Sequence, residues 1–246
     1  MVNKFTQKDV CLLLLAGTGS RLYQDIKVKK QFYPVNHREL YLYALDNLMK
    51  SNLFQRIVLV IDKEDKDRIV LDLKNKVELN DDTEISIVLG GKDRNESVFN
   101  GLKSLEDIDG DFPVFIHDAA RPIIEKETLN QLHEAIILHD AITLCLPMHD
   151  SVLKMKDNKI TYVNRKDLYR VLTPQVFVYS KIYNIYKDGY DKKDTDDFKK
   201  AVKSNLDCFL LRGKSINMKV TELDDLEIIE NVLKNQQVMN NDDKVE

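Results

Sequence analysis

The first stretch of the chain that could do chemistry joins two glycines to a group of cations. Residues 12–31 read LLLLAGTGSRLYQDIKVKKQ, in which Gly17 and Gly19 follow an apolar run and precede Arg21 and three lysines. Glycines let backbone N–H groups approach an anion closely, and arginine and lysine neutralise phosphate charge. The stretch therefore favours a phosphate-binding turn, with a plain tight turn and solvated lysines as the alternative.

Two familiar phosphate-binding motifs do not match this stretch. The P-loop requires a lysine directly after its last glycine, and no lysine follows Gly19. The dinucleotide motif GxGxxG requires a third glycine, where this chain has Leu22 and Tyr23. The sequence remains compatible with a different site, in which backbone N–H groups of the glycine turn and the cations that follow it together bind a nucleoside triphosphate.

Two further turns carry polar residues directly after predicted strands. GGKDRNESVFNGL offers a glycine pair, Arg94 and Ser97, and HDAARP offers Asp118 and Arg121. The carboxyl ends of parallel strands meet at one sheet edge, where ligands bind. A carboxylate there can hold a metal ion or a sugar hydroxyl. A buried ion pair between Asp118 and Arg121 is the alternative.

The elements that position these turns follow from hydrophobic periodicity. Short apolar runs alternate with segments whose apolar residues recur at helical spacing. This predicts an α/β, Rossmann-like fold with a mainly parallel central sheet and helices on both faces. The predicted strands are 10–15, 57–61, 85–89, 114–116 and 141–146, and the predicted helices are 40–53, 65–77, 96–105 and 126–139.

The pattern changes after Pro147. Asp157 and Asn158 form a typical hairpin turn between two short strand-like pieces, 151–156 and 159–164. This β-hairpin is too charged to bury a face alone, so we expect a protruding arm at about 149–170. The remaining predictions are helices at 181–187, 196–203 and 223–233, strands at 208–211 and 217–220, one domain at 1–234, and a frayed polar tail at 235–246.

The composition argues against several classes of partner. The formal net charge is −4, so any bound anion must be held by a local cluster. The lysine run has no neighbouring aromatic platform for nucleic acid. No apolar run approaches the roughly 20 residues that span a bilayer, and none resembles a signal peptide. With three cysteines that lack CxxC spacing, we expect a cytoplasmic protein without nucleic-acid or membrane partners.

Covalent and metal-centred chemistry find little support in the sequence. No GxSxG motif is present, and the five histidines lack zinc-binding spacing. The acidic run DKKDTDD at 191–197 lacks the glycine and the terminal glutamate of a calcium loop. We expect Asp194 or Thr195 to cap the helix that follows.

Seven motifs together point to one enzyme family. They are LAGTGSR with KKQF, GGKDRNESVFNGL, HDAARP, PMHDSVLK, NRKDLYRVLTPQVF, DTDD and NMKVTELDDL, and the resemblance that they carry runs from about residue 10 to residue 226. The sequence resembles the cytidylyltransferases that make CDP-activated polyol phosphates, within the sugar-nucleotidyltransferase fold. The likeness is closest to the 2-C-methyl-D-erythritol 4-phosphate cytidylyltransferase family.

The resemblance implies an activity and a set of site residues. The implied enzyme transfers the cytidylyl group of CTP to 2-C-methyl-D-erythritol 4-phosphate, with Mg²⁺ as cofactor, in isoprenoid precursor synthesis. The implied catalytic residues are Arg21 and Lys30. The implied nucleotide-binding residues are Leu15, Ala16, Gly17, Gly19, Gly91, Ser97, Asp118 and Ala119. The implied substrate-binding residues are Asp118, Arg165, Thr173, Thr195 and Lys219, and Asp118 is also the implied metal ligand.

The resemblance also implies a homodimer formed by arm exchange, in which Arg165 acts in the partner's site. The chain departs from the family where Lys29 replaces the usual proline before a Lys-Gln pair. Because proline would stiffen this loop, Lys27, Lys29 and Lys30 all remain candidates for the lysine that braces the triphosphate. Leu15 stands where a small residue is usual, and the family's Asp-Thr before the arm becomes Asp-Ser here.

Three other functions remain open at this point. A ribitol 5-phosphate cytidylyltransferase has similar loops, and side-by-side turnover of the two polyol phosphates separates it. A nucleotide-binding module without catalysis is the second, although Arg21, Lys30 and Lys219 are intact. A dinucleotide-dependent oxidoreductase is the third, and NADH binding would favour it.

Overall fold

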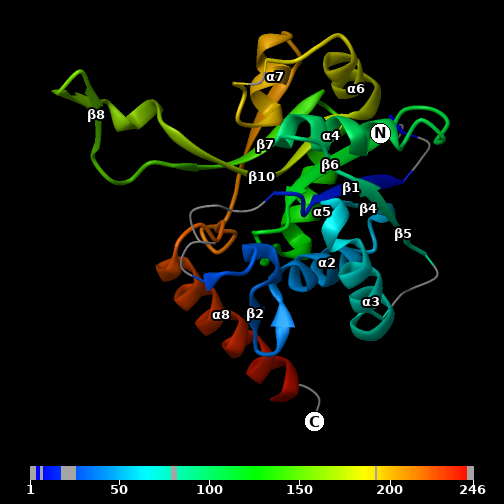
Figure 1. The fold of residues 1–246 in the computed structure, drawn as a ribbon. Helices are drawn as coiled ribbons and strands as arrows, with labels where there is room; N and C mark the ends of the chain where they lie inside the picture. Colours follow the sequence, from blue (N-terminus) through cyan, green and yellow to red (C-terminus); the bar gives the residue numbers. More distant parts are fainter. Residues whose placement is uncertain (1–3, 6–7, 18–25, 79–81, 192, 243–246) are drawn as a thin grey trace.

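The central sheet has seven described strands in the order β11-β7-β10-β6-β1-β4-β5 (Figure 1). The computed structural model describes residues 4–5, 8–17, 26–78, 82–191 and 193–242, with side chains described up to residue 235. Neighbouring described strands are parallel except β10, which is antiparallel to β6 and β7. The strands are β1 (Asp9–Leu14), β4 (Phe54–Ile61), β5 (Glu84–Leu89), β6 (Pro113–Asp118), β7 (Ala141–Pro147), β10 (Tyr169–Val178) and β11 (Cys208–Arg212).

The path of the chain through this sheet defines where a ligand should bind. From β1 the chain proceeds to β4 and β5 on one side and then returns to β6, on the other side of β1. This reversal is a topological switch point, and ligands of open α/β sheets bind beyond the strand ends at such points. The fold therefore directs attention to the loops that follow β1 and β6.

Alternate residues of β1 pack into two separate hydrophobic cores. Cys11 and Leu13 face one core, with side chains of α2, α3 and α5, and Val10, Leu12 and Leu14 face the other, with α4, α6 and α7. A strand covered on both faces reads as a continuous apolar run, and the predicted helices on both faces are confirmed. The helices are α2 (Leu40–Ser51), α3 (Lys66–Lys76), α4 (Arg94–Lys103), α5 (Lys126–Ile136), α6 (Tyr179–Lys187), α7 (Asp197–Lys203) and α8 (Leu223–Asp242).

Strand β10 is the main element that the sequence pattern did not predict. It contains Pro174, and proline within a run argues against a central strand because it cannot donate to the ladder. The structure accommodates it through a register shift: the pairing with β7 stops at Val171 and resumes at Gln175. The pairing with β6 also involves Gln175 and the residues after it. The proline therefore falls between paired stretches.

The predicted strand at 217–220 is wrong. Asn217 N–H closes a turn onto the carbonyl of Lys214 (3.1 Å), and its side-chain amide donates to the carbonyl of Thr173 (2.8 Å). Val220 N–H donates to the carbonyl of Ala120 (2.9 Å). Because the two backbone bonds go to loop carbonyls, and the bond to strand residue Thr173 comes from the Asn217 side chain, the segment forms no ladder with a described strand, and it brings its residues to the end of β6.

Two predicted helix ends also differ in the structure. Asp196, rather than Asp194 or Thr195, caps α7 by accepting the N–H of Lys199. Asp194 is unavailable because its carboxylate binds the ammonium groups of Lys199 and Lys203 (2.9 and 2.7 Å). Helix α8 continues past the predicted end at residue 233 to Asp242, because no glycine or proline stops it there.

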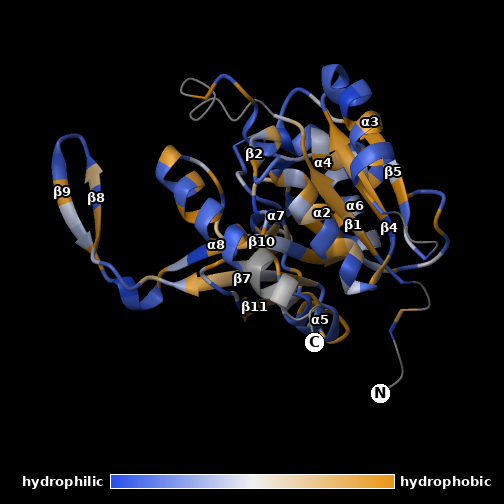
Figure 2. Cartoon of the chain, turned by 90° about the horizontal axis from the view of Figure 1, so that it is seen from below, coloured by the Kyte–Doolittle hydropathy of each residue, from blue (hydrophilic) through white to orange (hydrophobic). Residues whose placement is uncertain are grey.

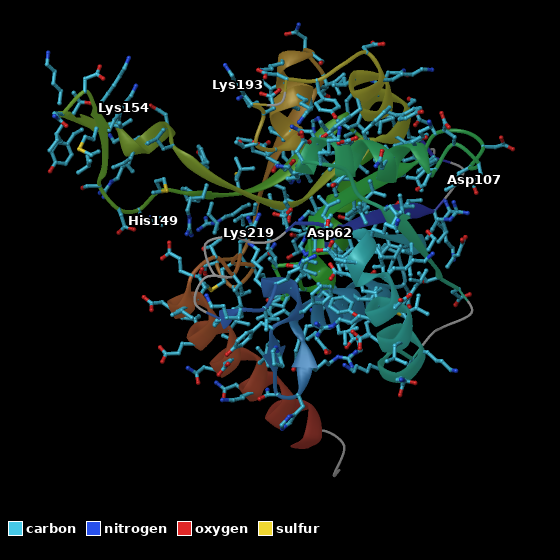
Figure 3. The ribbon with its side chains drawn as sticks, viewed as in Figure 1. Asp62, Asp107, His149, Lys154, Lys193 and Lys219 are labelled. Atoms are coloured by element: carbon cyan, nitrogen blue, oxygen red, sulfur yellow. The ribbon has the colours of Figure 1, made fainter. Side chains whose placement is uncertain are left out.

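The predicted hairpin is confirmed as a two-stranded arm. It consists of β8 (Val152–Lys156) and β9 (Lys159–Val163). Asp157 and Asn158 have φ values of 50° and 58°, as the central residues of a type I′ turn require. The arm stands away from the body of the molecule in two views (Figures 1 and 2), and Lys154 lies towards its outer end (Figure 3).

Smaller elements complete the fold before α2 and α3 and after β9. A short hairpin of β2 (Pro34–Val35) and β3 (Arg38–Glu39) precedes α2. The short 3₁₀ helices are η1 (Lys30–Phe32), η2 (Lys63–Asp65) and η3 (Arg165–Asp167). No helix within the described ranges combines the length and the apolar character needed to cross a membrane.

Candidate active site

A cavity of about 180 Å³ opens at the switch point, between the ends of β1 and β6. Segments distant in the sequence meet there: the loop after β1, η1, the start of α4, the end of β6 and the segment before α8. The residues whose polar groups matter are Gly17, Lys30, Gln31, Arg94, Asp118 and Lys219.

The loop after β1 is held at both of its described ends. Leu15 N–H and Ala16 N–H both donate to the carbonyl of Val60 in β4 (2.8 and 2.9 Å). Gly17 has a φ of +117°, a backbone conformation that residues with a Cβ atom rarely adopt. The Gln31 amide donates to the carbonyls of Leu15 (2.6 Å) and Gly17 (3.0 Å). The loop is thereby fixed from below by β4 and from the side by η1.

The structure separates the lysines that the sequence left as alternatives. Lys30 lines the cavity. The Nζ of Lys29 instead lies among three carboxylates, 2.8 Å from Asp62, 2.9 Å from Glu64 and 2.7 Å from Asp65. Neither Lys29 nor Lys27 is among the lining residues of the cavity. The geometry therefore favours Lys30 for any contact with a bound phosphate.

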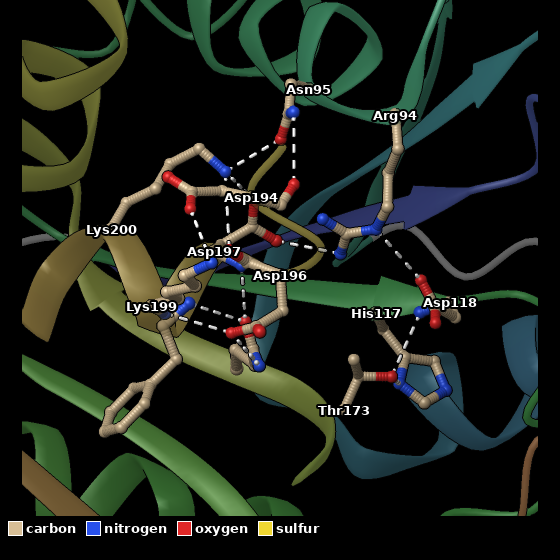
Figure 4. A network of polar contacts seen from close by, with 12 residues as sticks. Arg94, Asn95, His117, Asp118, Thr173, Asp194, Asp196, Asp197, Lys199 and Lys200 are labelled. Carbon is tan, nitrogen blue, oxygen red and sulfur yellow. Dashed lines mark hydrogen bonds and ion pairs between the residues drawn. The ribbon is translucent and has the colours of Figure 1, made fainter. Parts of the chain in front are cut away.

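Asp118 lies at the end of β6 between cations. Its Oδ2 is 2.6 Å from Nζ of Lys219. Its Oδ1 is 3.6 Å from Nε of Arg94 (Figure 4). Burial alone would raise the pKa of Asp118, but the charges of Lys219, Arg94 and Arg121 hold it well below its usual range. The alternative pair between Asp118 and Arg121 does not form, because the Arg121 guanidinium donates to the carbonyl of Asn217 (2.9 Å).

Arg94 connects the cavity to a buried carboxylate at the start of α7. Its Nη2 is 2.8 Å from Oδ2 of Asp197, which is fully buried (Figure 4). Tyr186 OH donates to the same carboxylate, and the side-chain oxygen of Gln175 accepts the N–H of Asp197 (3.1 Å). The sequence signal for Arg94 was its place between a glycine pair and a helix, but no role was inferred. Nothing in the sequence linked it to Asp197.

The turn after β5 packs against the loop after β1, as the shared sheet edge predicted. Ser97 Oγ accepts the N–H of Gly91 (3.0 Å) and donates to the carbonyl of Asp93 (2.9 Å). A Cβ added at Gly90 would lie 2.8 Å from both Ala16 Cβ and Ser97 Oγ, so only glycine allows this approach. Gly91 and Ser97 lie together beside the loop, although neither lines the cavity.

Thr173 is buried beneath Asp118 rather than facing the cavity. Its Oγ1 accepts the N–H of Asp118 (3.2 Å) and lies 3.1 Å from Nδ1 of His117 (Figure 4). The other ring nitrogen of His117 lies 3.1 Å from the carbonyl of Arg121. Since a carbonyl only accepts, we assign the proton to Nε2. Burial lowers the pKa of His117 to about 4, so the ring is neutral and supports Asp118 through Thr173.

Two other predicted residues lie near the site without lining the cavity. Ala119 is fully buried, and its N–H donates to the carbonyl of Leu14 (3.1 Å), which joins the end of β6 to β1. Thr195 is exposed and directly precedes Asp196, the N-cap of α7. The helix that follows Thr195 therefore begins at the carboxylate that holds Arg94.

The structure does not bring Arg165 to the cavity of its own chain. Arg165 lies in the arm, where its guanidinium donates to the carbonyl of His149, and His149 is seen on the protruding segment in Figure 3. The predicted residues Gly19 and Arg21 lie outside the described residues.

The donor set at the cavity fits a metal ion that arrives with a nucleotide. Among the described residues, no group of three or more histidine, cysteine or acidic side chains is arranged to hold a metal ion. Of the described residues that line the cavity, Asp118 alone has a carboxylate. Mg²⁺ keeps several water ligands and is coordinated mainly by substrate phosphates, so one protein carboxylate is enough to bind it.

Comparison with known proteins decides the family. The family model described as IspD, 2-C-methyl-D-erythritol 4-phosphate cytidylyltransferase, matches residues 10–235. The chain belongs to this cytidylyltransferase family. It is therefore a nucleotidyltransferase, and the resemblance drawn from the motifs and the predicted fold class are both confirmed.

Several relatives of this cytidylyltransferase match it along nearly their whole length. The 2-C-methyl-D-erythritol 4-phosphate cytidylyltransferase of Thermotoga neapolitana is 36% identical over 220 residues, which are 89% of this chain and 94% of that one. The enzyme of the same name from Clostridioides difficile is 28% identical over 228 residues, 90% and 92% of the two chains. A crystal structure of 4-diphosphocytidyl-2C-methyl-D-erythritol synthase from Anaerococcus prevotii superposes with a TM-score of 0.78 at 25% identity and covers 93% and 99%.

Proposed function

We propose that this cytidylyltransferase transfers the cytidylyl group of CTP to 2-C-methyl-D-erythritol 4-phosphate and releases pyrophosphate, in isoprenoid precursor synthesis. One observation carries the proposal: Lys30, Arg94 and Lys219 converge with the Gly17 loop on a single cavity at the switch point. Three cations around one carboxylate give the local positive field that a triphosphate and a second phosphate need, in a chain whose net charge is −4.

The reaction requires little proton chemistry from the protein. A phosphate oxygen of the polyol substrate bonds to the α-phosphorus of CTP. The bond from that phosphorus to the oxygen bridging to the β-phosphate breaks, and its electron pair leaves on pyrophosphate. The nucleophile is already an anion near neutral pH, so no general base is needed. Repulsion between anions is the obstacle, and catalysis consists of positioning and electrostatic stabilisation.

The residues divide between the two substrates. Lys30 would stabilise the reacting α-phosphate, and Lys219, paired with Asp118, would hold the phosphate of the polyol. Arg94 would keep Asp118 and the start of α7 in place. The remaining proposed contacts follow the resemblance: Leu15, Ala16, Gly17, Gly19, Gly91, Ser97 and Ala119 for CTP, Thr173, Thr195 and Arg165 for the polyol phosphate, and Arg21 beside Lys30 for the transition state.

We propose Mg²⁺ as the cofactor, with Asp118 as its protein ligand. When bound, the ion would offset the negative charge of the triphosphate. The carboxylate is already ionised, because the surrounding cations hold its pKa well below the usual range. The ammonium group of Lys219 lies 2.6 Å from the same carboxylate, so Mg²⁺ would share this carboxylate with a lysine. The protein would then supply few oxygen ligands, as expected for an ion that binds mainly to the phosphates of the nucleotide.

We propose a homodimer in which each arm packs against a second copy of the chain. Leu153 pairs with Tyr162, and Met155 with Ile160, across the β8–β9 ladder. All four side chains therefore share one face, and they are between 53% and 79% exposed. An exposed apolar face of this kind favours an interaction surface. Packing the arm on a partner would cover it and carry Arg165 to another cavity.

The described cysteines support a reducing location. Cys11, Cys145 and Cys208 are all free. Thiols persist unpaired in the cytosol, so we propose a cytoplasmic enzyme, and cell fractionation would check this.

Pyrophosphate release tests the proposed activity. CTP and Mg²⁺ are combined with 2-C-methyl-D-erythritol 4-phosphate or with ribitol 5-phosphate, each over a range of concentrations. We expect a higher kcat/KM for the methylerythritol substrate. A higher value for ribitol 5-phosphate would favour the second cytidylyltransferase. Binding of CTP without release from either substrate would identify an inactive nucleotide-binding module.

A further inference from the structure

Lys29 lies at the centre of three carboxylates beside the active-site loop. Its Nζ is within 2.9 Å of oxygens of Asp62, Glu64 and Asp65. Its side chain is only 12% exposed, so the ammonium group has exchanged most of its water for these partners. Burial alone would lower the pKa of Lys29, but the carboxylates raise it above its usual range. Among the described residues, Lys29 is the cation that pairs with all three carboxylates, so losing it would leave their mutual repulsion without a shared paired charge.

The same cluster reaches the loop that lines the cavity. Oδ2 of Asp62 accepts both the Lys29 ammonium (2.8 Å) and the backbone N–H of Gly17 (3.1 Å). Two positions after Lys29, the Gln31 amide holds the carbonyl of Gly17 (3.0 Å). Lys29 and Gln31 therefore hold the chain on either side of Lys30. Both connect to Gly17, Lys29 through Asp62 and Gln31 directly.

A third contact fixes the far end of η1. Phe32 N–H donates to the carbonyl of Lys29 (2.8 Å). The Phe32 ring packs edge-on against Tyr41, with centroids 5.5 Å apart, and the Arg68 guanidinium lies 4.3 Å from its centroid. The C-terminal end of η1 is thus held by packing, whereas its N-terminal end is held by the ion pairs of Lys29.

We propose that Lys29 is a positioning residue, whose ion pairs with Asp62, Glu64 and Asp65 hold Lys30 and the Gly17 loop in place at the cavity. The inference rests on the proposed function, in which Lys30 stabilises the α-phosphate of CTP. Lys29 itself touches no substrate in this role, because its ammonium group is taken up by the carboxylates. It also offsets three negative charges that would otherwise repel the triphosphate.

The backbone of Lys29 explains how a lysine can serve at this position. Its φ is −60° and its ψ is 130°, and a proline ring would impose a similar φ. A proline restrains the backbone through its ring, whereas Lys29 restrains it through ion pairs to another segment. Because ion pairs depend on charge, a substitution that removes only the charge of Lys29 tests this positioning role directly.

The test measures steady-state pyrophosphate release by Lys29→Met, which keeps the length of the side chain and removes the cation. A misplacement of about 1 Å can lower a rate about 100-fold, so we expect kcat to fall about 10- to 100-fold. KM for CTP should rise, while KM for the polyol phosphate stays within about twofold. Lys29→Arg should recover most activity, since a guanidinium also pairs with carboxylates. Lys63→Met, an exposed lysine of η2, is the matched control and should behave as wild type.

A double variant separates positioning from a general effect on the fold. In a Lys30→Met background, Lys29→Met should lower kcat by a clearly smaller factor than in wild type, because only its effects on the Gly17 loop and on the carboxylate charge remain. An equal loss in both backgrounds would overturn the inference, and so would full activity of Lys29→Met. Lys29→Gln, which keeps a hydrogen-bond donor, replaces Lys29→Met in the comparison should the latter not fold by circular dichroism.

The outcomes for Lys29 and for the proposed function can be told apart. If Lys30→Met loses activity and Lys29→Met does not, the inference fails and the proposed function stands. If Lys30→Met is as active as wild type, the role of Lys30 fails, and the inference about Lys29 fails with it.

Discussion

The cavity at the end of β1 and the arm of β8 and β9 are built in opposite ways. Around the cavity, charged side chains are fixed by one another, as Arg94 is by Asp197 at 2.8 Å and Lys219 by Asp118 at 2.6 Å. On the arm, apolar side chains face solvent, and Tyr162 is 79% exposed. The cavity is therefore preorganised within one chain, whereas the two arm strands pair only with each other among the described strands of their own chain.

The largest expected contrast between the two regions is in catalysis. Lys30→Ala removes a preorganised cation at the cavity, and loss of one such group lowers kcat about 10²- to 10³-fold. Lys154→Ala removes an exposed cation from the arm and should leave kcat unchanged. Single-turnover measurement of pyrophosphate release checks both. Equal effects of the two substitutions would mean that the cavity is not where the chemistry occurs.

Buried charge should make the cavity region more sensitive to substitution than the arm. Asp197→Asn leaves the partly buried Arg94 without its 2.8 Å ion pair, and breaking a buried pair destabilises a protein by about 3 kcal/mol or more. Asp157→Asn lies in the arm turn, where asparagine tolerates the same left-handed backbone, and should change stability by less than about 0.5 kcal/mol. Urea unfolding measures both free energies. A smaller loss for Asp197→Asn would mean that water replaces the pair.

The buried His117 gives the cavity region a dependence on pH. Its folded pKa of about 4 lies below the ordinary value of 6.5, so the unfolded chain takes up the proton first as pH falls. Its contribution is therefore fully present above about pH 6.5 and is lost between pH 6.5 and 4, by up to about 3 kcal/mol. Urea unfolding at several pH values should show a shallower acid slope for His117→Gln than for wild type. Parallel slopes would contradict a neutral buried ring.

Arg165 tests whether the arm completes a cavity in another chain. Arg165→Ala removes a charge-assisted contact of about 1.5–3 kcal/mol, so KM for the polyol phosphate should rise about 10- to 100-fold while KM for CTP stays unchanged. Mixing Arg165→Ala with Lys30→Ala chains should restore part of the activity, because a mixed dimer has one cavity with both residues. No recovery in a confirmed mixed dimer would place Arg165 in its own chain's site.

The smallest expected effect on the fold of the chain concerns the apolar face of the arm. Tyr162→Asp puts a charge on a side chain that is already exposed, so the free energy of unfolding of the isolated chain should change by less than about 0.5 kcal/mol. Sedimentation should nevertheless show a shift from dimer to monomer, since the charge would have to be buried against the partner. An unchanged dimer would mean that another surface associates.

The central parallel strands were predictable because burial on both faces requires a continuous run of apolar residues. A strand such as β1, covered by helices on both faces, must be apolar at successive positions, and this pattern survives without knowledge of the fold. β10 has no such continuous apolar run. Pro174 interrupts it, and only the shift in pairing between Val171 and Gln175 shows how a central strand accommodates a proline.

The sequence alone indicated which turns meet at one edge of the sheet, beside the cavity. Gly17, the glycine pair before Arg94, and Asp118 each follow a strand, and parallel strands end at one edge for any chain of this class. That rule depends on local pattern and chain direction, so it needs no coordinates. The motifs also determined the family.

Which charged side chains form pairs became visible in the folded chain alone. Lys29 and Lys30 are neighbours of the same type, but one is drawn to the carboxylates after β4 and the other lines the cavity. A pair between Asp118 and Arg121 was an alternative that the sequence left open, and Asp118 meets Lys219 and Arg94 instead. Spacing along the chain fixes which residues are near in sequence. The direction of a side chain depends on segments that fold back from a hundred residues away, and those contacts have no local signature.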